Sequence, residues 1–248
     1  MKVVVIGGTG LIGSKVVGKL TAHGHTAVAA SPNSGVNTLT GEGVDEALAG
    51  ADVVVDVSNS PSFADDAVMD FFTKSTSTLI EAERKAGVKH HVALSVVGTD
   101  RLTDSGYMRA KVAQEKLIEG SNVPYSIVHA TQFFEFVKSI ADAATDGDVV
   151  KLASVLIKPM AAEDVATAVA RAAVASPTGG IHEVSGPEEF RLNEFVAKGL
   201  AARQDPRTVV VDPGATYFGA VLSERELVPA PDAETYSTTF AEWLAAAK

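Results

Sequence analysis

The chain has 248 residues, of which 46% are hydrophobic and 21% charged, a composition typical of a soluble globular protein with a well-filled core. Its formal net charge of -10 would repel a phosphate backbone, so nucleic acid is not expected as a partner. The sequence contains no cysteine, which excludes disulfides, thiolate metal sites and a cysteine nucleophile. A reducing compartment fits this composition, and we expect a cytoplasmic protein.

Short runs rich in Val and Ile alternate with longer stretches whose apolar residues recur every three or four positions. Continuous apolar runs are typical of parallel strands that are covered on both faces. The alternation predicts an α/β Rossmann fold, a doubly wound parallel sheet with helices on both faces and a ligand crevice at the carboxyl ends of the strands. The predicted strands are residues 2–6, 26–30, 53–57, 91–96 and 125–129, and the predicted helices are residues 11–23, 63–86 and 107–120.

The first apolar run is too short for a secretory signal or a membrane span, so no membrane association is expected. After about residue 130 the alternation weakens, and shorter predicted strands mix with most of the prolines. We interpret residues 1–130 as a nucleotide-binding core and residues 131–248 as a smaller substrate-binding cap. Because long linkers and repeats are absent from the sequence, cap and core are expected to interleave in a single folding unit, as a monomer or a homodimer.

A glycine-rich turn, Gly7-Gly8-Thr9-Gly10-Leu11-Ile12-Gly13, joins the first predicted strand to the first predicted helix. Gly7 permits the tight turn, Gly10 lets the backbone approach a pyrophosphate, and Gly13 allows close packing of the helix. The phosphates would then lie at the helix N-terminus. The alternative is a glycine turn that binds no ligand. The residues assigned to cofactor binding are Gly7, Thr9, Gly10, Leu11, Ile12 and Gly13.

The end of the second predicted strand bears on the choice of cofactor. An acidic residue about 20 positions beyond the glycines would hold the ribose 2′-hydroxyl of NAD, but no acidic residue precedes Glu42. Ser31 and Ser34 could instead donate hydrogen bonds to a 2′-phosphate, so NADP(H) is favoured over NAD(H). This region has no Arg, which leaves Lys15 as the closest basic candidate in the sequence. For both serines the alternative is plain turn chemistry.

Three side chains form a candidate catalytic group. Ser95 lies in the fourth predicted strand, and Tyr107 and Lys111 are four residues apart on one face of the following predicted helix. A carbonyl reductase needs an acid that donates a proton to oxygen while hydride reaches carbon, and a nearby ammonium makes a phenol a better acid. We predict that Tyr107 donates the proton, Lys111 lowers its pKa, and Ser95 orients the substrate oxygen. The alternative is a tyrosine and a lysine on a solvated helix face.

Together these motifs resemble the atypical short-chain dehydrogenases/reductases of the NmrA-like group. That group includes NADPH quinone reductases and isoflavone reductase-like enzymes, and also redox sensors without catalytic activity. Several members lack the active-site tyrosine, whereas this chain keeps Tyr107, and many have an Arg where this chain has Ser31-Pro32. The resemblance is carried by the glycine loop, Ser95, Tyr107, Lys111 and Glu115, and by residues 125–128, 132–133, 162–166 and 184–187.

In this group the end of the third core strand lies beside the cofactor ribose, which implies that Asn59 contacts the cofactor. A helix N-cap is the equally weighted alternative for Asn59. The predicted function is therefore an NADPH-dependent oxidoreductase that reduces a small carbonyl, quinone or enone compound.

Two other functions remain open at this point. The first is a regulatory protein that senses NADP(H) without turnover, and the second is a sugar-nucleotide epimerase, for which the cap leaves limited room. No metal site is predicted, because His90 and His91 point to opposite faces of a strand and the other histidines show no ligand spacing.

Overall fold

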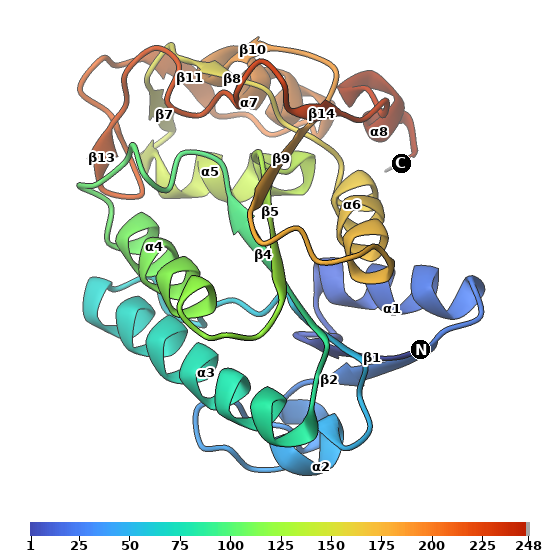
Figure 1. Ribbon diagram of the computed structural model, residues 1–248. Helices are drawn as coiled ribbons and strands as arrows, with labels where there is room; N and C mark the ends of the chain where they lie inside the picture. The colour runs from blue at the N-terminus through green and yellow to red at the C-terminus, as the bar shows by residue number, and fades with distance from the viewer. Residues whose placement is uncertain (247–248) are drawn as a thin grey trace.

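The computed structural model describes residues 1–246, and its centre is a seven-stranded sheet in the order β14-β9-β5-β4-β3-β1-β2 (Figure 1). Every neighbouring pair of strands in this sheet is parallel. The predicted Rossmann fold is thereby confirmed. The strands are β1 (Lys2–Ile6), β2 (Thr26–Ala30), β3 (Val53–Asp56), β4 (His90–Val96), β5 (Tyr125–Ala130), β9 (Ile181–Ser185) and β14 (Glu234–Thr235).

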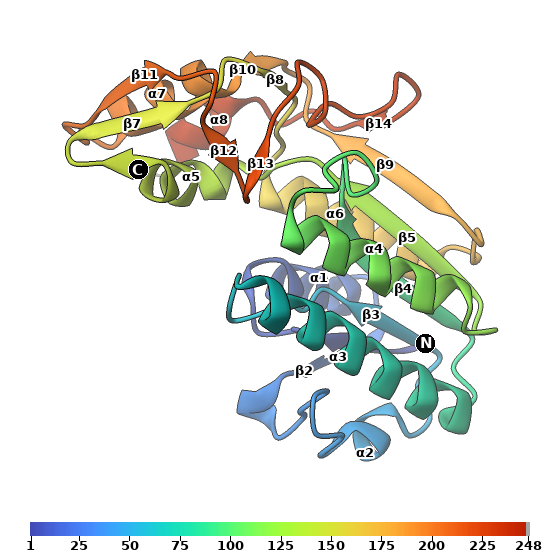
Figure 2. The same ribbon diagram turned by 90° about the vertical axis from the view of Figure 1, so that its left-hand side faces the viewer.

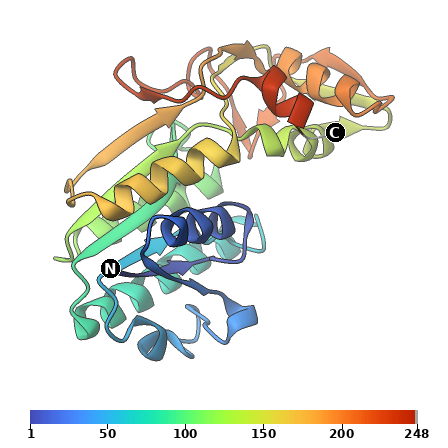
Figure 3. The same cartoon turned by 90° about the vertical axis from the view of Figure 1, so that its right-hand side faces the viewer.

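Helices cover both faces of the sheet, as Figures 1 and 3 show. On one face α1 packs against α6, and on the other α3 packs against α4. The buried residues of α1 include Ile12, Val16 and Leu20, whose spacing places them on the side that faces the sheet. The helices of this core are α1 (Leu11–Ala22), α2 (Val44–Leu48), α3 (Asp65–Ala86), α4 (Gly106–Glu119) and α6 (Ala162–Val174).

Most of the residues that follow β5, apart from those of α6, β9 and β14, build a smaller layer at the carboxyl end of the sheet. Its core is largely aliphatic but contains an aromatic cluster, in which the rings of Phe195 and Phe240 lie 4.7 Å apart and Phe134 contacts both. This layer contains α5 (Val137–Ala143), α7 (Leu192–Ala202), α8 (Phe240–Ala246), β6 (Thr145–Asp146), β7 (Val149–Leu152), β8 (Leu156–Ile157), β10 (Phe190–Arg191), β11 (Thr208–Val211), β12 (Thr216–Tyr217) and β13 (Ala220–Val221), with a short 3₁₀ turn at Phe134–Phe136. A second 3₁₀ turn, Pro32–Ser34, follows β2 in the core.

The second half of the chain also contributes to the central sheet. β9 pairs with β5, β14 pairs with β9, and α6 lies on the face that α1 covers. The two halves of the sequence therefore share one sheet, and the chain crosses between the layers more than once. None of the helices within residues 1–246 combines the length and the apolar composition that a membrane span requires.

Candidate cofactor and substrate site

The glycine loop is held between the two strands that flank β1. The backbone N–H groups of Gly7 and Gly8 both donate to the carbonyl oxygen of Ala30 at the end of β2, at 2.9 and 3.2 Å. Gly7 has a φ of +76°, and a Cβ there would lie 2.9 Å from the backbone of Ser58, which follows β3. A side chain at Gly7 would therefore meet both backbone strain and a steric clash.

The same loop leaves an open cradle at the start of α1. A Cβ at Gly13 would collide with the carbonyl oxygen of Gly7, so the helix approaches the loop too closely for any side chain. A Cβ at Gly10, the N-cap residue, would meet only the Gly7 oxygen at 3.3 Å. The first N–H groups of a helix have no intrahelical partner and attract anions. A nucleotide diphosphate fits this arrangement because the open side of Gly10 adjoins those N–H groups.

The other predicted residues of the loop differ in exposure. Thr9 and Leu11 are exposed, whereas Ile12 is buried in the core under α1. Ile12 can therefore offer a ligand its backbone N–H but not its side chain.

Ser31 and Ser34, both predicted to bind a 2′-phosphate at the end of β2, differ in their hydrogen bonding. The hydroxyl of Ser31 is buried and has no hydrogen-bond partner among the described residues. The hydroxyl of Ser34 is used within the turn, since it accepts from the Ser31 N–H at 2.9 Å and donates to the Ser31 carbonyl at 3.0 Å. Lys15 forms an ion pair with Glu163 of α6 at 3.0 Å. Of these three side chains, Ser31 is the one with an uncommitted polar atom.

Asn59 lies next to Tyr107. The Tyr107 hydroxyl donates to Asn59 Oδ1 at 3.3 Å, and the same oxygen accepts from the Ser60 N–H at 3.0 Å. Helix α3 begins at Asp65 with Ala64 as its N-cap, so Asn59 does not cap it. The structure thus brings a predicted cofactor residue and the predicted proton donor together at the carboxyl end of β3.

Three phenylalanine rings surround Tyr107. Its ring centroid lies 5.7 Å from that of Phe63, 5.9 Å from that of Phe72 and 5.6 Å from that of Phe218. Burial raises the pKa of the Tyr107 hydroxyl to about 12, because a phenolate is poorly solvated among these rings. At neutral pH the group is a protonated phenol.

Lys111 turns inward, although it shares a helix face with Tyr107. Its ammonium donates to the Leu94 carbonyl at 3.0 Å and to Gln114 Oε1, and it lies 4.4 Å from the centre of the Phe72 ring. The three N–H bonds of the ammonium match these three neighbours. Among the described residues no hydrogen bond joins Lys111 to the Tyr107 hydroxyl.

The surroundings of Lys111 shift its own pKa. Burial lowers the pKa of Lys111 to about 8, against the opposing influence of Asp56 and Glu115. Asp56, at the end of β3, accepts a hydrogen bond from Gln114 Nε2 at 3.0 Å. Through Gln114 the hydrogen bonds of Lys111 therefore reach β3, the strand next to the β4 residue Leu94. The ammonium is thereby committed to a buried polar network.

Ser95 belongs to a second buried network. Its hydroxyl donates to Glu115 Oε1, which also lies 2.9 Å from His129 Nε2. Burial tends to raise the pKa of Glu115, but hydrogen bonds from His129 and Ser95 hold it below its ordinary value. Because the Ser95 proton is directed at a carboxylate, its oxygen is left only as an acceptor, and the side chain is buried. The structure therefore does not pair Ser95 with Tyr107.

Four residues of these surroundings were not identified from the sequence. Asp56 and Gln114 carried a usable signal, since Asp56 ends a buried strand and Gln114 is three residues from Lys111. Phe63 and Phe218 carried none, because they come from loops far apart in the chain.

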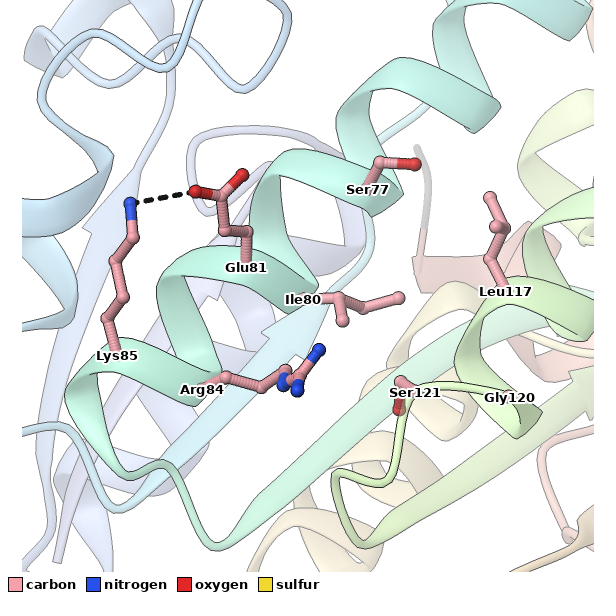
Figure 4. Close-up of a pocket in the computed structure, with 8 residues that line it drawn as sticks. All are labelled: Ser77, Ile80, Glu81, Arg84, Lys85, Leu117, Gly120 and Ser121. Atoms are coloured by element: carbon pink, nitrogen blue, oxygen red, sulfur yellow. Dashed lines mark ion pairs between the residues drawn. The ribbon is translucent and has the colours of Figure 1, made fainter.

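A surface groove lies between the C-terminal halves of α3 and α4 (Figure 4). Within it Lys85 is paired with Glu81 at 3.0 Å. The groove adjoins the segment that leads into the amino end of β4, whereas the glycine loop follows the carboxyl end of β1. The groove and the loop therefore lie at opposite ends of the parallel strands. It is lined by Ser77, Ile80, Glu81, Arg84, Lys85, Leu117, Gly120 and Ser121.

Comparison with known proteins agrees with the fold and the glycine loop. A family model described as NAD(P)H-binding matches residues 7–177. A reductase of Streptomyces griseus named for (4-alkanoyl-5-oxo-2,5-dihydrofuran-3-yl)methyl phosphate is 29% identical over 214 residues, which cover 79% of this chain and 72% of that protein.

Solved structures show the same architecture at low sequence identity. An NADPH-dependent quinone oxidoreductase of Escherichia coli, solved with NADPH, has a TM-score of 0.70 and 18% identity, and the match covers 99% of each chain. MoeE5, solved with UDP-glucose and NAD, has a TM-score of 0.71 and 18% identity, with coverage of 96% of this chain and 90% of that one. These two likenesses concern the fold alone.

Proposed function

Because the chain belongs to the NAD(P)H-binding family and its motifs resemble those of the NmrA-like atypical short-chain dehydrogenases/reductases, we propose that it is an NADPH-dependent oxidoreductase acting on a small carbonyl, quinone or enone compound. In this proposal Tyr107 is the proton donor and the glycine loop holds the cofactor diphosphate.

The observation that carries the proposal is the position of the Tyr107 hydroxyl. Gly7 of the cofactor cradle packs against the backbone of Ser58. The next residue, Asn59, accepts a hydrogen bond from the Tyr107 hydroxyl through its Oδ1 at 3.3 Å. The protonated Tyr107 phenol therefore contacts Asn59, the residue next to the one that packs against the cradle. An acid in this place is what a hydride-transfer reaction requires.

When bound, the reduced nicotinamide supplies a hydride. Tyr107 donates its proton to the substrate oxygen, so the C=O bond becomes a C–O–H group. Before this step the Tyr107 hydroxyl donates a hydrogen bond to Asn59 Oδ1. In the reaction the substrate oxygen replaces Asn59 Oδ1 as the acceptor. Tyr107 is only partly buried, so the phenolate that remains can regain a proton from solvent.

The proposed role of Lys111 is electrostatic. It is a buried cation one helical turn from Tyr107, and it stabilises a developing phenolate through space without a hydrogen bond. Asp56 and Glu115 offset part of this charge. Because Ser95 donates its proton to Glu115, this proposal gives it the role of holding that carboxylate at the end of β4 rather than that of orienting the substrate oxygen.

The proposed preference for NADPH has two supports. No acidic residue precedes Glu42, so a 2′-phosphate at the end of β2 meets no like charge from this segment. The buried hydroxyl of Ser31 has no partner among the described residues and is available to donate to a phosphate oxygen.

The test is calorimetric titration with NADPH and NADH, followed by the nicotinamide absorbance in the presence of ketones, quinones and enones. We expect tighter binding of NADPH and its consumption with at least one substrate class. Tight binding without consumption by any of the compounds would replace the reductase by a nucleotide sensor. Failure to bind either nucleotide would refute both.

A further inference from the structure

A small hairpin from the second half of the chain reaches the proposed proton donor. β12 and β13 are joined by Phe218 and Gly219, and Figure 2 shows this hairpin directed from the upper layer toward the start of α4. Phe218 has a φ of +47° and Gly219 a φ of +86°, so both turn residues are left-handed. This conformation suits glycine but strains a bulky residue.

The Phe218 ring stacks on Tyr107. The two ring planes are inclined by 28°, and Phe63 lies 5.7 Å from each ring centre. Phe218 is 44% exposed and Phe63 53% exposed, so neither ring is held in place as a core residue. A strained and exposed phenylalanine that covers a proton donor is not explained by packing alone.

We propose that Phe218 occupies the subsite for a flat aromatic ring of the substrate, and that such a ring displaces it from Tyr107. The inference rests on the proposed function and narrows it to carbonyl or quinone compounds that carry an aromatic ring. Phe63 is the second wall of this subsite, the Tyr107 ring is the surface that selects for flatness, and Phe218 is the gate that covers it.

The geometry explains why the gate can open. The strands of the hairpin are two residues long, and a two-stranded hairpin of this kind has little stability of its own. Movement of the turn also releases the strain at Phe218. Phe218 and the ligand compete for the face of Tyr107, so only molecules with the hairpin open can bind. The apparent affinity equals the affinity of the open state multiplied by the fraction of molecules that are open.

The geometry also explains the selectivity. A flat ring regains the stacking on Tyr107 that Phe218 gives up, with its carbonyl directed along the ring plane toward the hydroxyl edge. A puckered ring of equal size cannot stack in this way. The cost of opening is therefore recovered for aromatic ligands only.

The test uses two ligands that differ in ring flatness and are not reduced, benzamide and cyclohexanecarboxamide, titrated into the full chain saturated with NADP⁺. Phe218→Asn is the main variant, since Asn tolerates left-handed backbone, and Phe218→Ala is the second. Val221→Ser, on the same hairpin and 58% exposed, is the matched control.

We expect benzamide to bind the wild type more tightly than cyclohexanecarboxamide. Phe218→Asn and Phe218→Ala remove the closed state, so both should strengthen the binding of either ligand by about threefold to tenfold, the range of a stacked aromatic pair, and leave the preference for benzamide in place. Phe63→Leu should reduce the preference for benzamide. Val221→Ser should behave as the wild type.

Equal binding of the two ligands by the wild type, or benzamide binding that is unchanged or weakened in both Phe218 variants, would overturn the inference. These titrations do not depend on turnover. Absence of NADPH consumption would count against the reductase proposal, and its outcome is read separately from the ring selectivity.

Discussion

The glycine loop and the surroundings of Tyr107 are built in different ways. The loop is a single segment, Gly7 to Gly13, whose shape follows from close contacts between neighbouring backbone atoms. The Tyr107 site is assembled from the loop after β3, from α3 and α4, and from the β12–β13 hairpin, through side-chain rings. The first region leaves an open cradle, and the second is closed over by its own phenylalanines.

The difference indicates how specificity is divided. A backbone cradle recognises a diphosphate, which all nicotinamide cofactors share, and it has little freedom to vary. A site lined by side chains from a loop, two helices and a hairpin can change its substrate without disturbing the sheet. The following experiments test whether the two regions are independent in this way.

Tyr107→Phe is expected to have the largest effect. It removes the proposed proton donor and keeps the ring, so ketone reduction should fall by about 100-fold or more, while NADPH binding stays as in the wild type. Steady-state kinetics and calorimetric titration measure the two quantities. Unchanged turnover of a ketone would remove Tyr107 from the mechanism.

Lys111→Met tests the buried network beneath Tyr107. The pKa of Lys111 is lowered from 10.5 to about 8, so between these pH values the unfolded chain still binds a proton that the folded protein has lost. The free energy of unfolding therefore rises with pH in this window for the wild type relative to the variant, by about 2–3 kcal/mol between pH 7 and pH 10. Urea unfolding of both proteins at several pH values measures the difference, and a parallel pH dependence would show that Lys111 is solvated.

Gly13→Ala tests the cradle. The new methyl group would collide with the Gly7 carbonyl, so the loop must shift away from α1. We expect a loss of stability of about 1–3 kcal/mol and weaker binding of both NADPH and NADH. Gly18→Ala, where a Cβ would meet nothing within 4 Å, is the control in the same helix. Equal nucleotide affinity in the two variants would place the cofactor elsewhere.

Ser31→Ala is expected to have the smallest effect. Loss of one hydrogen bond to the 2′-phosphate should weaken NADPH binding by about fivefold and leave NADH binding unchanged. Ser34→Ala should affect NADPH less, because the Ser34 hydroxyl is already used within its turn. Titration of both variants with both nucleotides distinguishes these cases. An equal loss of affinity for NADPH and NADH in Ser31→Ala would indicate that the Ser31 hydroxyl does not bind the 2′-phosphate.

Much of the core could be predicted because its signals are local. The strands at residues 2–6 and 26–30 have the predicted bounds, since each is a continuous apolar run next to a turn. The two-residue strands β12, β13 and β14 lack any such pattern, because their pairing is decided by the layers around them.

The site was less predictable for the same reason. The spacing of Tyr107 and Lys111 correctly placed them on one helix face, but the Leu94 carbonyl and Gln114 determine where the ammonium points. The stacking of Phe218 on Tyr107 joins residues more than a hundred positions apart, and nothing in either segment indicates the contact.

The pairing of β5 with β9 has a consequence for biosynthesis. β5 is complete at Ala130, but its partner begins at Ile181, so a nascent chain leaving the ribosome carries β5 as an exposed edge until β9 follows. Unpaired edges of apolar strands invite association with other chains. A fragment that ends at residue 130 should therefore aggregate, and chaperone capture during synthesis should be strongest in the interval between these two strands.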